Sequence, residues 1–406
     1  MSRDDGSDVI KICGLLQRGA DVNGTEDLHG RTPLIISAMQ GGEFIQIIAE
    51  LLLKHEKLDM NAKDRSGNTT LIMASMIGHE AIVRIFLKND GMDVNAKTDN
   101  GYTSLILAIK YGKKEVVRIL LKDNRVDVNV NDDYGKTALI LACENGDEEV
   151  VDILLKDDRM DVNAKDNDGA TALIAASRYG RKEVVEMFLK DKRVDVNVKQ
   201  HNGCTALMMA SCGGSCQEVV GTLLKDDRVD VNAKDNQGRI ALIKASHYGD
   251  QRVVGTLLKD DRVDVNAKNN DGVTALIAAI RLGKKEVVGI LLNDGSVDVN
   301  ANDLRGCSAF FWPNYRGSPE TIHMILKHER LDVNATGGAL GNTALMWACL
   351  RGQAAIVSEL LAFPMVDVHA KNKAGSTALD IARELKMLEI ARLLEACTES
   401  YIWRDR

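Results

Sequence analysis

Several features that are common in membrane, secreted and nucleic-acid-binding proteins are missing from this sequence. No apolar run approaches about eighteen residues, so no membrane span is expected, and Met1–Asp5 has no apolar core for a signal peptide. The 59 acidic residues outnumber the 52 basic ones, and the net charge of −7 argues against a nucleic-acid-binding surface. The eight cysteines are scattered irregularly, which fits a reducing compartment. These absences predict a cytoplasmic protein without a membrane or nucleic-acid partner.

Catalytic and cofactor motifs are also missing. The sequence has no H-E-x-x-H, no phosphate-binding G-x-x-x-x-G-K-[ST], no G-x-S-x-G and no C-x-x-C pair. The tightest metal-like group is Cys204, Cys212 and Cys216, and only a distant His201 or His247 is available as a fourth ligand, although zinc sites usually pair their ligands closely. We therefore expect no catalytic residue, no cofactor and no metal site, and we interpret these cysteines as small reduced side chains.

One stretch, Asp166–Lys199, contains the pattern on which most of the chain is built. Asp168-Gly169 is predicted to be a two-residue turn that needs positive φ and forms a hairpin tip. Thr171 can cap a helix from Ala172 to about Tyr179, and a second amphipathic helix is predicted from about Lys182 to Lys190. Both helices carry apolar residues that nothing within the stretch can cover. Such a unit is stable only when it is stacked against copies of itself.

The copies are present along the chain. The leucine of the first helix recurs every 34 or 35 residues after a first interval of 37, at positions 34, 71, 105, 139, 173, 207, 242, 276, 310 (as phenylalanine), 345 and 379. G-x-T-A-L, a later glycine, E-V-V-x-x-L-L and D-V-N recur in step. A period in the low thirties with one turn and two helices is typical of ankyrin repeats. The chain resembles the ankyrin-repeat family over nearly its whole length, which implies an all-α solenoid with short hairpin tips and a curved, elongated stack.

The pattern predicts three regions. Residues 1–27 are expected to form an N-terminal capping half-repeat with one helix at about Val9–Arg18, residues 28–371 ten repeats, and residues 372–406 a C-terminal capping repeat, helical to about Ala396, with a short tail. Repeat one is longer by three residues, which we interpret as one extra helical turn or a bulge in its second helix. Pro313 falls about five residues into the first helix of repeat nine, where it removes a backbone hydrogen bond.

Repeat nine gathers four of the sixteen aromatic residues of the chain within six positions: Phe310, Phe311, Trp312 and Tyr315. Trp347 holds the place in repeat ten that Trp312 holds in repeat nine, so stacking is expected to bring the two indoles close together. The lengthened hairpin Gly337–Gly341 lies beside them in the sequence. Two interpretations remain open: the large side chains fill space left by a distorted helix, or they present an aromatic anchor to a partner.

The family resemblance also implies where a partner binds. In ankyrin repeats the usual binding face is concave and is lined by the hairpin tips and by the two residues before the glycine that ends the first helix. Carried onto this sequence, with the aromatic cluster added, the candidate partner-binding residues are Met76, Lys110, Tyr111, Arg178, Tyr179, His247, Tyr248, Arg281, Phe311, Trp312, Tyr315 and Trp347. Tyrosine and arginine are favoured interface anchors. The alternative is that each tyrosine packs on the next repeat with its hydroxyl in water.

We therefore expect a non-enzymatic scaffold or adaptor that is monomeric by itself and binds another protein on the concave face. The alternative is a recruiting or inhibitory subunit of an enzyme whose catalytic part lies on another chain. A third possibility is nucleic-acid binding through the basic loops Lys113-Lys114, Arg181-Lys182 and Lys284-Lys285, which a strongly salt-dependent affinity would reveal.

Overall fold

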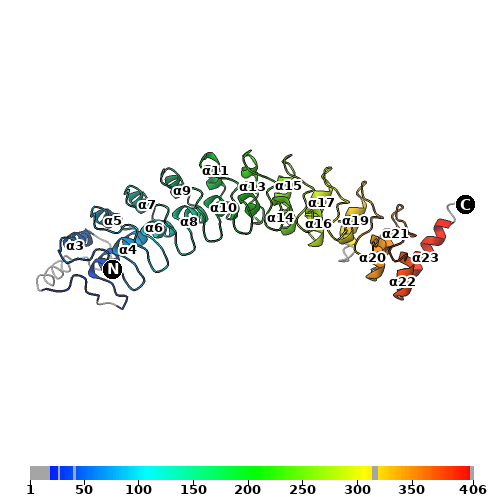
Figure 1. Ribbon diagram of the computed structural model, residues 1–406, viewed down its shortest axis with the longest axis horizontal. Helices are drawn as coiled ribbons and strands as arrows, with labels where there is room; N and C mark the ends of the chain where they lie inside the picture. Colours follow the sequence, from blue (N-terminus) through cyan, green and yellow to red (C-terminus); the bar gives the residue numbers. More distant parts are fainter. Residues whose placement is uncertain (1–18, 26–27, 40–42, 215, 313–318, 403–406) are drawn as a thin grey trace. The chain divides into compact units, whose positions relative to one another are not determined.

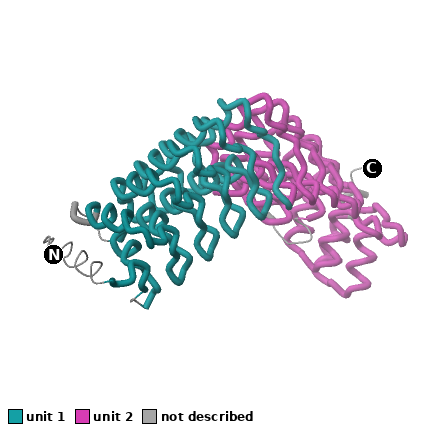
Figure 2. The backbone as a smooth tube through the Cα atoms, turned by 60° about the vertical axis from the view of Figure 1, so that its left-hand side comes forward, with its two compact units in different colours: residues 1–201 teal, residues 202–406 magenta. Residues whose placement is uncertain are grey.

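The computed structural model describes residues 19–25, 28–39, 43–214, 216–312 and 319–402. The chain divides into two compact units, which are described separately: an N-terminal unit, residues 1–201, and a C-terminal unit, residues 202–406 (Figure 2). In both units the described segments are helical and are joined by turns. No strand occurs in them, and β pairing is limited to three isolated antiparallel bridges, Asn131 with Thr137, Asn302 with Ser308 and Gly337 with Asn342.

The N-terminal unit consists of two parallel rows of helices (Figure 1). One row contains the first helices of successive repeats, each in contact with the next: α2 (Pro33–Met39), α4 (Thr70–Ile77), α6 (Ser104–Lys110), α8 (Ala138–Asn145) and α10 (Ala172–Arg178). The other row contains the second helices, which also contact their neighbours in order: α3 (Glu43–Leu53), α5 (Glu80–Leu87), α7 (Lys114–Leu121), α9 (Glu148–Leu155) and α11 (Lys182–Lys190).

The C-terminal unit repeats this arrangement. Its first helices are α12 (Ala206–Ala210), α14 (Ala241–Tyr248), α16 (Ala275–Arg281), α20 (Ala344–Leu350) and α22 (Ala378–Glu384). Its second helices are α13 (Gln217–Leu224), α15 (Gln251–Leu257), α17 (Lys285–Leu292), α19 (Pro319–Leu326), α21 (Ala354–Leu361) and α23 (Leu388–Ile402). Each second helix contacts the following one, from α13 to α23. The predicted position of Pro313 inside a helix lies outside the described residues.

Local sequence explains where the first helices begin and how they pack. In α10 the Thr171 hydroxyl accepts a hydrogen bond from the backbone N–H of Ile174, which satisfies one of the free donors at the helix start, as predicted. Leu173 is buried, and the neighbouring Ala175 and Ala176 are buried as well, so their small side chains allow the adjacent helices to approach closely. The predicted second helix is confirmed at both ends, because α11 runs from Lys182 to Lys190.

The predicted two-residue turn at the hairpin tip is wrong. Of the two residues, only Gly169 has a positive φ, +79°. Asp168 does not, because Lys386 is the one non-glycine residue with positive φ in the described part of the chain. The loop has three residues and is closed by the backbone N–H of Asp166, which donates to the Ala170 carbonyl at 2.9 Å. The Asp166 carboxylate also accepts hydrogen bonds from the backbone N–H groups of Asp168 (2.9 Å) and Ala170 (2.8 Å). The side chain of Asp166 therefore carries part of the turn that we assigned to the backbone alone.

A ladder of asparagine side chains connects neighbouring repeats within each unit. The Asn129 side-chain amide donates to the Arg159 carbonyl at 2.8 Å, and its oxygen accepts from the Asp161 backbone N–H at 2.8 Å. Both partners belong to the next repeat. The same pair of bonds is made by Asn23, Asn61, Asn95, Asn163, Asn232, Asn266, Asn300 and Asn334. The asparagine of the D-V-N signal is thus the residue that joins one repeat to the next.

Arginines in the exit loops close the ends of the second helices. The Arg159 guanidinium donates to the carbonyl of Leu121 at 3.0 Å, and Leu121 is the last residue of α7 in the preceding repeat. This satisfies a carbonyl that the helix end leaves free. The same guanidinium pairs with the Asp157 carboxylate at 2.6 Å. The hydrogen bonds from Arg159 hold the pKa of the Asp157 carboxyl below its usual value. Arg125, Arg193 and Arg262 reach the preceding repeat in the same way.

The ends of the chain depart from the regular pattern. Helix α3 has eleven residues where α5 has eight, so the extra residues of repeat one form one more helical turn. Leu379, the last leucine of the series, is only half-buried, whereas Leu173 is buried. Helix α23 continues to Ile402, beyond the predicted end at Ala396. The helix predicted at Val9–Arg18 lies outside the described residues.

We predict that Leu173→Ala destabilises the stack locally. Truncation of this buried side chain leaves a cavity, and the expected loss is about 2–5 kcal/mol. Because each repeat contacts only its neighbours, hydrogen exchange should accelerate in repeats four to six and stay unchanged in repeats one and two. An increase spread evenly over the chain would contradict this prediction.

We also predict that Asn129→Asp weakens the contact between repeats three and four. The aspartate keeps an acceptor for the Asp161 N–H but places a second oxygen against the Arg159 carbonyl, and the expected cost is about 1–3 kcal/mol. Asn124→Asp, which makes the same change of charge at an exposed position in the loop of Asn129, is the control. Urea unfolding of both variants checks the prediction, and equal midpoints would show that the ladder is energetically unimportant.

Candidate functional site

Three tyrosines hold equivalent positions at the ends of first helices and are half-exposed. Tyr111 follows α6, Tyr179 follows α10, and Tyr248 is the last residue of α14. Their side chains are 52, 48 and 53% exposed, respectively, so none of them is packed into the core. Each precedes a glycine with positive φ that ends the helix, which fixes where the ring leaves the backbone. A half-exposed ring fits both an interface anchor and a ring that packs on the next repeat with its hydroxyl in water.

The residues beside the tyrosines of the N-terminal unit have partners that the sequence did not reveal. The Lys110 ammonium donates to the Tyr102 hydroxyl at 3.1 Å and lies 4.2 Å from the centre of the Tyr102 ring. Arg178 donates to the Gln200 side chain at 3.2 Å. Met76 packs against a small core cluster together with Tyr102. Tyr102 therefore belongs to this surface, and its aromatic type near a hairpin tip was the signal that we missed.

The basic loops have a structural role in addition to their charge. Arg181 donates to the carbonyl of Glu144 in the preceding repeat at 3.0 Å. A Cβ atom added at Gly146 would lie only 2.7 Å from the Arg181 side chain, so the arginine packs directly on that glycine. Lys113 and Lys284 cover the corresponding glycines, Gly78 and Gly249, in the same way. These cations thus close the ends of first helices, where a positive charge is favourable.

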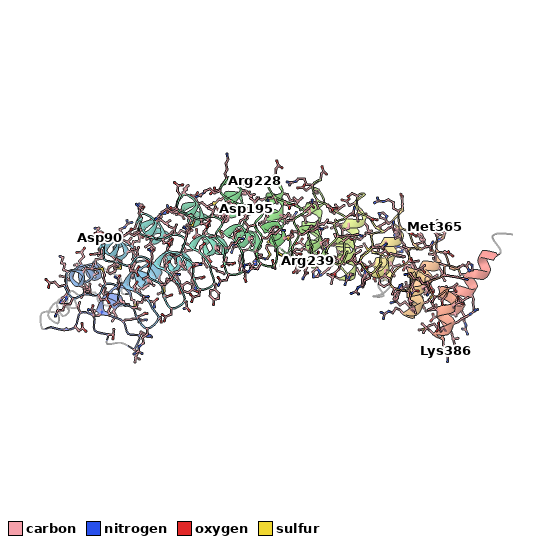
Figure 3. All side chains as sticks on the ribbon, in the orientation of Figure 1. Asp90, Asp195, Arg228, Arg239, Met365 and Lys386 are labelled. Atoms are coloured by element: carbon pink, nitrogen blue, oxygen red, sulfur yellow. The ribbon has the colours of Figure 1, made fainter. Side chains whose placement is uncertain are left out.

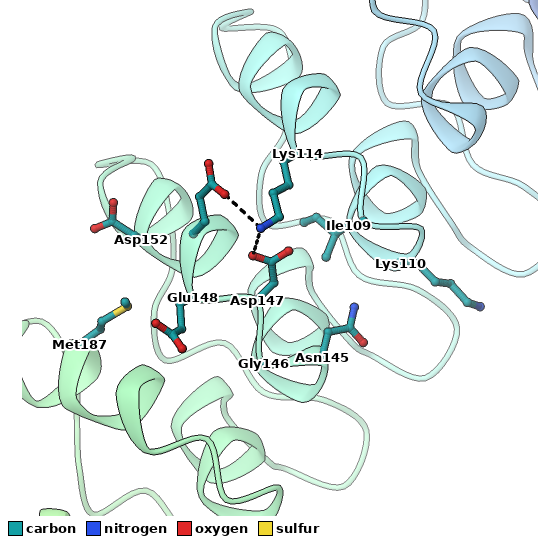
Figure 4. A pocket seen from close by; sticks show the side chains of 11 residues that line it. Ile109, Lys110, Lys114, Asn145, Gly146, Asp147, Glu148, Asp152 and Met187 are labelled. Atoms are coloured by element: carbon teal, nitrogen blue, oxygen red, sulfur yellow. Dashed lines mark hydrogen bonds and ion pairs between the residues drawn. The ribbon is translucent and has the colours of Figure 1, made fainter.

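A charged hollow of about 830 Å³ lies between repeats three and four (Figure 4). The Lys114 ammonium at its rim pairs with Asp147 and with Glu149, both at 3.0 Å. The hydrogen bonds from Lys114 and Arg118 lower the pKa of Glu149. In turn, the hydrogen bonds to Asp147 and Glu149 raise the pKa of Lys114. Lys114, Asp147 and Glu149 are therefore paired with one another.

The C-terminal unit contains a buried lysine that the sequence analysis passed over. Lys244 of α14 is 4% exposed, and its ammonium lies 3.3 Å from Asp235 and 3.2 Å from the Cys204 sulfur. Burial opposes ionisation of Asp235, but the bonds and charge of Arg239 outweigh it and lower the pKa of that carboxyl. The sequence signal for this buried lysine was Lys244 itself, which stands where the first helix of repeat five has Ala175. Arg239 lies at the edge formed by hairpins and first helices, opposite Arg228 (Figure 3).

His247 lies in the same region of the C-terminal unit. Its ring contacts the ring of Tyr248 edge to face at 5.2 Å. Burial lowers the pKa of His247, and the positive charges of Arg239, Lys284 and Lys244 lower it further. The charges that lower the pKa of His247 are therefore all cationic, although the chain as a whole is acidic.

The aromatic cluster of repeats nine and ten is mostly buried. Phe310 is 2%, Phe311 8% and Trp312 9% exposed, and Trp347 is half-buried. Phe311 makes edge-to-face contacts with Trp312 at 5.3 Å and with Trp347 at 4.8 Å, so stacking does bring the two indoles to one phenylalanine ring. Trp312 therefore packs inside the cluster and does not project into solvent as a separate anchor. Tyr315 lies outside the described residues.

The described residues contain no group of three or more histidine, cysteine, aspartate or glutamate side chains arranged to hold a metal ion. Cys204 and Cys216 are buried, and Cys212 is half-buried with its thiol directed to the Met208 carbonyl. Nor does any helix of this part of the chain combine the length and the apolar character that crossing a membrane requires.

These features define a repeat protein in which paired helices stack through asparagine bridges and present a row of loop residues. A family model described as ankyrin repeats (three copies) matches overlapping segments at residues 4–98, 42–132, 105–200, 158–235, 189–269, 207–303, 242–337 and 311–401. The chain therefore belongs to the ankyrin-repeat family, whose repeats generally mediate protein–protein interactions and are typically not catalytic.

Solved structures agree with this assignment. One similar structure is the crystal structure of the ankyrin repeat domain of Bcl-3, a unique member of the IkappaB protein family. It is 27% identical, with a TM-score of 0.51, and the match covers 56% of this chain and 100% of that domain. A comparison with curated proteins found no match.

We predict opposite outcomes for Trp312→Ala and Tyr179→Ala. Loss of the buried indole should cost about 3–5 kcal/mol, whereas loss of the half-exposed phenol should change stability by no more than about 0.5 kcal/mol. Thermal or urea unfolding of both variants checks this. Equal stability losses would mean that the two side chains do not differ in packing as described.

Proposed function

We propose that this chain is a non-enzymatic protein-recognition scaffold that binds a partner through the hairpin and first-helix edge of its repeats. The observation that carries the proposal is the recurrence of a half-exposed tyrosine beside a basic or titratable residue: Lys110-Tyr111, Arg178-Tyr179 and His247-Tyr248. Only sixteen residues of the chain are aromatic, so three at the same exposed position are a specific feature. Tyrosine supplies a large contact area together with a hydroxyl, which suits an interface anchor.

The partner class follows from the charges. The cations beside the tyrosines lie on an acidic chain, and an acidic or mixed protein surface complements them better than a basic one. The basic loops that suggested nucleic-acid binding are partly occupied, since Arg181 and Lys114 already bond to neighbouring repeats. We further propose a monomer located in the cytoplasm, with capping regions at residues 1–27 and 372–406 around ten repeats.

The double variant Tyr111→Ala, Tyr179→Ala tests the proposal. Proteins that co-purify with the tagged wild-type chain are identified by mass spectrometry, and the affinity of each purified candidate is measured by calorimetry. The double variant should lose about 2 kcal/mol of binding free energy or more, roughly thirtyfold in Kd, with an unchanged melting temperature.

Lys190→Ala, an exposed change at the end of α11 on the opposite row of helices, is the matched control and should bind like the wild type. If every candidate partner binds the double variant as tightly as the wild type, the tyrosine edge is not the interface.

A further inference from the structure

Two hollows of the C-terminal unit share one arginine and form a continuous surface. The larger, about 590 Å³, lies between repeats nine and ten, and the smaller, about 230 Å³, between repeats seven and eight. Arg281 at the end of α16 lines both. The larger volume falls within the range of about 300–1,000 Å³ that is typical of ligand pockets. Its other lining residues include Arg305, Phe311, Trp312, Gly338 and Trp347.

The larger hollow is lined by residues in which repeats nine and ten depart from the repeat pattern. Two residues after the recurring leucine no other repeat carries an aromatic residue, as at Met73, Leu107 and Ala175, whereas these two carry Trp312 and Trp347. Phe311 contacts both indoles at interplanar angles of 89°, so the wall is a fixed aromatic surface. The lengthened hairpin passes directly beside it, because a Cβ at Gly338 would lie 3.4 Å from the Trp347 ring.

The cations at this aromatic wall are not neutralised by carboxylates. The Arg281 guanidinium lies 4.3 Å from the centre of the Trp312 ring. Within the described ranges, no carboxylate lies within ion-pair distance of Arg281 or Arg305, in contrast to Arg159 with its aspartate. The nearby Asp303 carboxylate accepts the backbone N–H groups of Arg305 and Cys307 at 2.9 and 3.0 Å and is buried. A stacked arginine with no acidic partner is a ready receptor for an anion.

The smaller hollow continues the positive surface. His247 and Arg239 line it together with Arg281, and Asp271 supplies its one carboxylate. Arg239 is already paired with Asp235 at 2.8 Å. Burial lowers the pKa of His247, and the neighbouring cations Arg239, Lys284 and Lys244 lower it further. The unpaired charge of the joined surface therefore lies at Arg281 and Arg305, beside the aromatic wall.

We propose that this surface binds an acidic peptide segment of a partner protein, with one large apolar side chain against Trp312 and Trp347 and carboxylates on Arg281 and Arg305. The proposal rests on the protein-recognition function above and names the ligand class of one of its sites. Planar guanidinium groups bind carboxylates in bidentate geometry, and the aromatic wall supplies the apolar contact that a purely electrostatic patch lacks. An anionic single-stranded nucleic acid is the competing ligand that the experiment must separate.

The test uses the full chain carrying Trp403→Phe, which leaves Trp312 and Trp347 as its only tryptophans. The probe is an acetylated nine-residue peptide with one central phenylalanine and four glutamates on each side. Tryptophan emission should change saturably on titration. Replacement of the phenylalanine by alanine, or of the glutamates by glutamines, should each weaken binding about tenfold or more. Arg305→Gln should have the same effect, as should Arg281→Gln. Arg252→Gln, an exposed arginine on α15, is the matched control and should bind as the parent does.

Several outcomes would overturn the proposal. These are the absence of saturable binding, equal affinity for the glutamine peptide, and tighter binding of a nine-nucleotide oligothymidylate than of the acidic peptide. If Arg281→Gln lowers the melting temperature because the Trp312 contact is lost, the exposed Arg305 supplies the result without it. A partner that requires Tyr111 and Tyr179 but binds the two arginine variants normally would refute this inference and leave the proposed function intact. If the acidic peptide binds as expected but no partner depends on Tyr111 and Tyr179, this inference stands and the proposed function is refuted.

Discussion

The side-chain amide of one asparagine in each repeat completes hydrogen bonds that the next repeat cannot complete alone. Asn129 both donates to a carbonyl and accepts from an N–H of its neighbour, so the loop that leaves a second helix is bonded to the repeat that precedes it. The apolar faces impose the same requirement, because α10, which carries the buried Leu173, packs against α8 of the preceding repeat. Polar and apolar interactions therefore make the repeats depend on one another for the same geometric reason.

The ladder also determines where the chain tolerates irregularity. Most rungs join an asparagine to a carbonyl 30 residues further on, but the separation is 34 for Asn23 and 31 for Asn334. The additional residues are taken up in the longer helix α3 and in the hairpin Gly337–Gly341, and both rungs remain intact. Exit loops are thus uniform, while hairpins and first-helix ends vary. The half-exposed Tyr111, Tyr179 and Tyr248 lie at the variable edge, and none of them makes one of the asparagine bonds between repeats.

Sequence alone predicted the features that each repeat determines locally. The helix Lys182–Lys190, the cap at Thr171 and the exposure of Tyr179 follow from residue types at fixed spacing. Contacts between separate segments were not predictable in this way. The bond from Lys110 to Tyr102 joins a helix end to a hairpin, and the burial of Trp312 depends on Phe311 and on the following repeat.

The turn at Asp166 shows a second kind of limit. The dipeptide Asp168-Gly169 indicated a hairpin tip correctly, but the loop type depended on a side chain two residues earlier, which accepts two backbone N–H groups. Lys244 was missed because a lysine in a helix of a soluble protein is usually exposed, and only its spatial neighbours Asp235 and Cys204 make its burial possible. Irregular residues within a regular repeat were the most informative signals.

The uniform exit loops have a consequence for the gene. Between Asn61 and Asn163, and again between Asn232 and Asn334, successive ladder residues are 34 positions apart, so removing or duplicating a segment of that length between any two equivalent points leaves every rung with a partner. Unequal recombination between repeats would therefore yield chains that still fold, differing in the number of hairpin edges they present. The near-identical segments Lys156–Asn167, Lys225–Asn236 and Lys259–Asn270 provide the sequence matches on which such recombination depends. The repertoire of binding surfaces in such a lineage would change by whole repeats as well as by single substitutions.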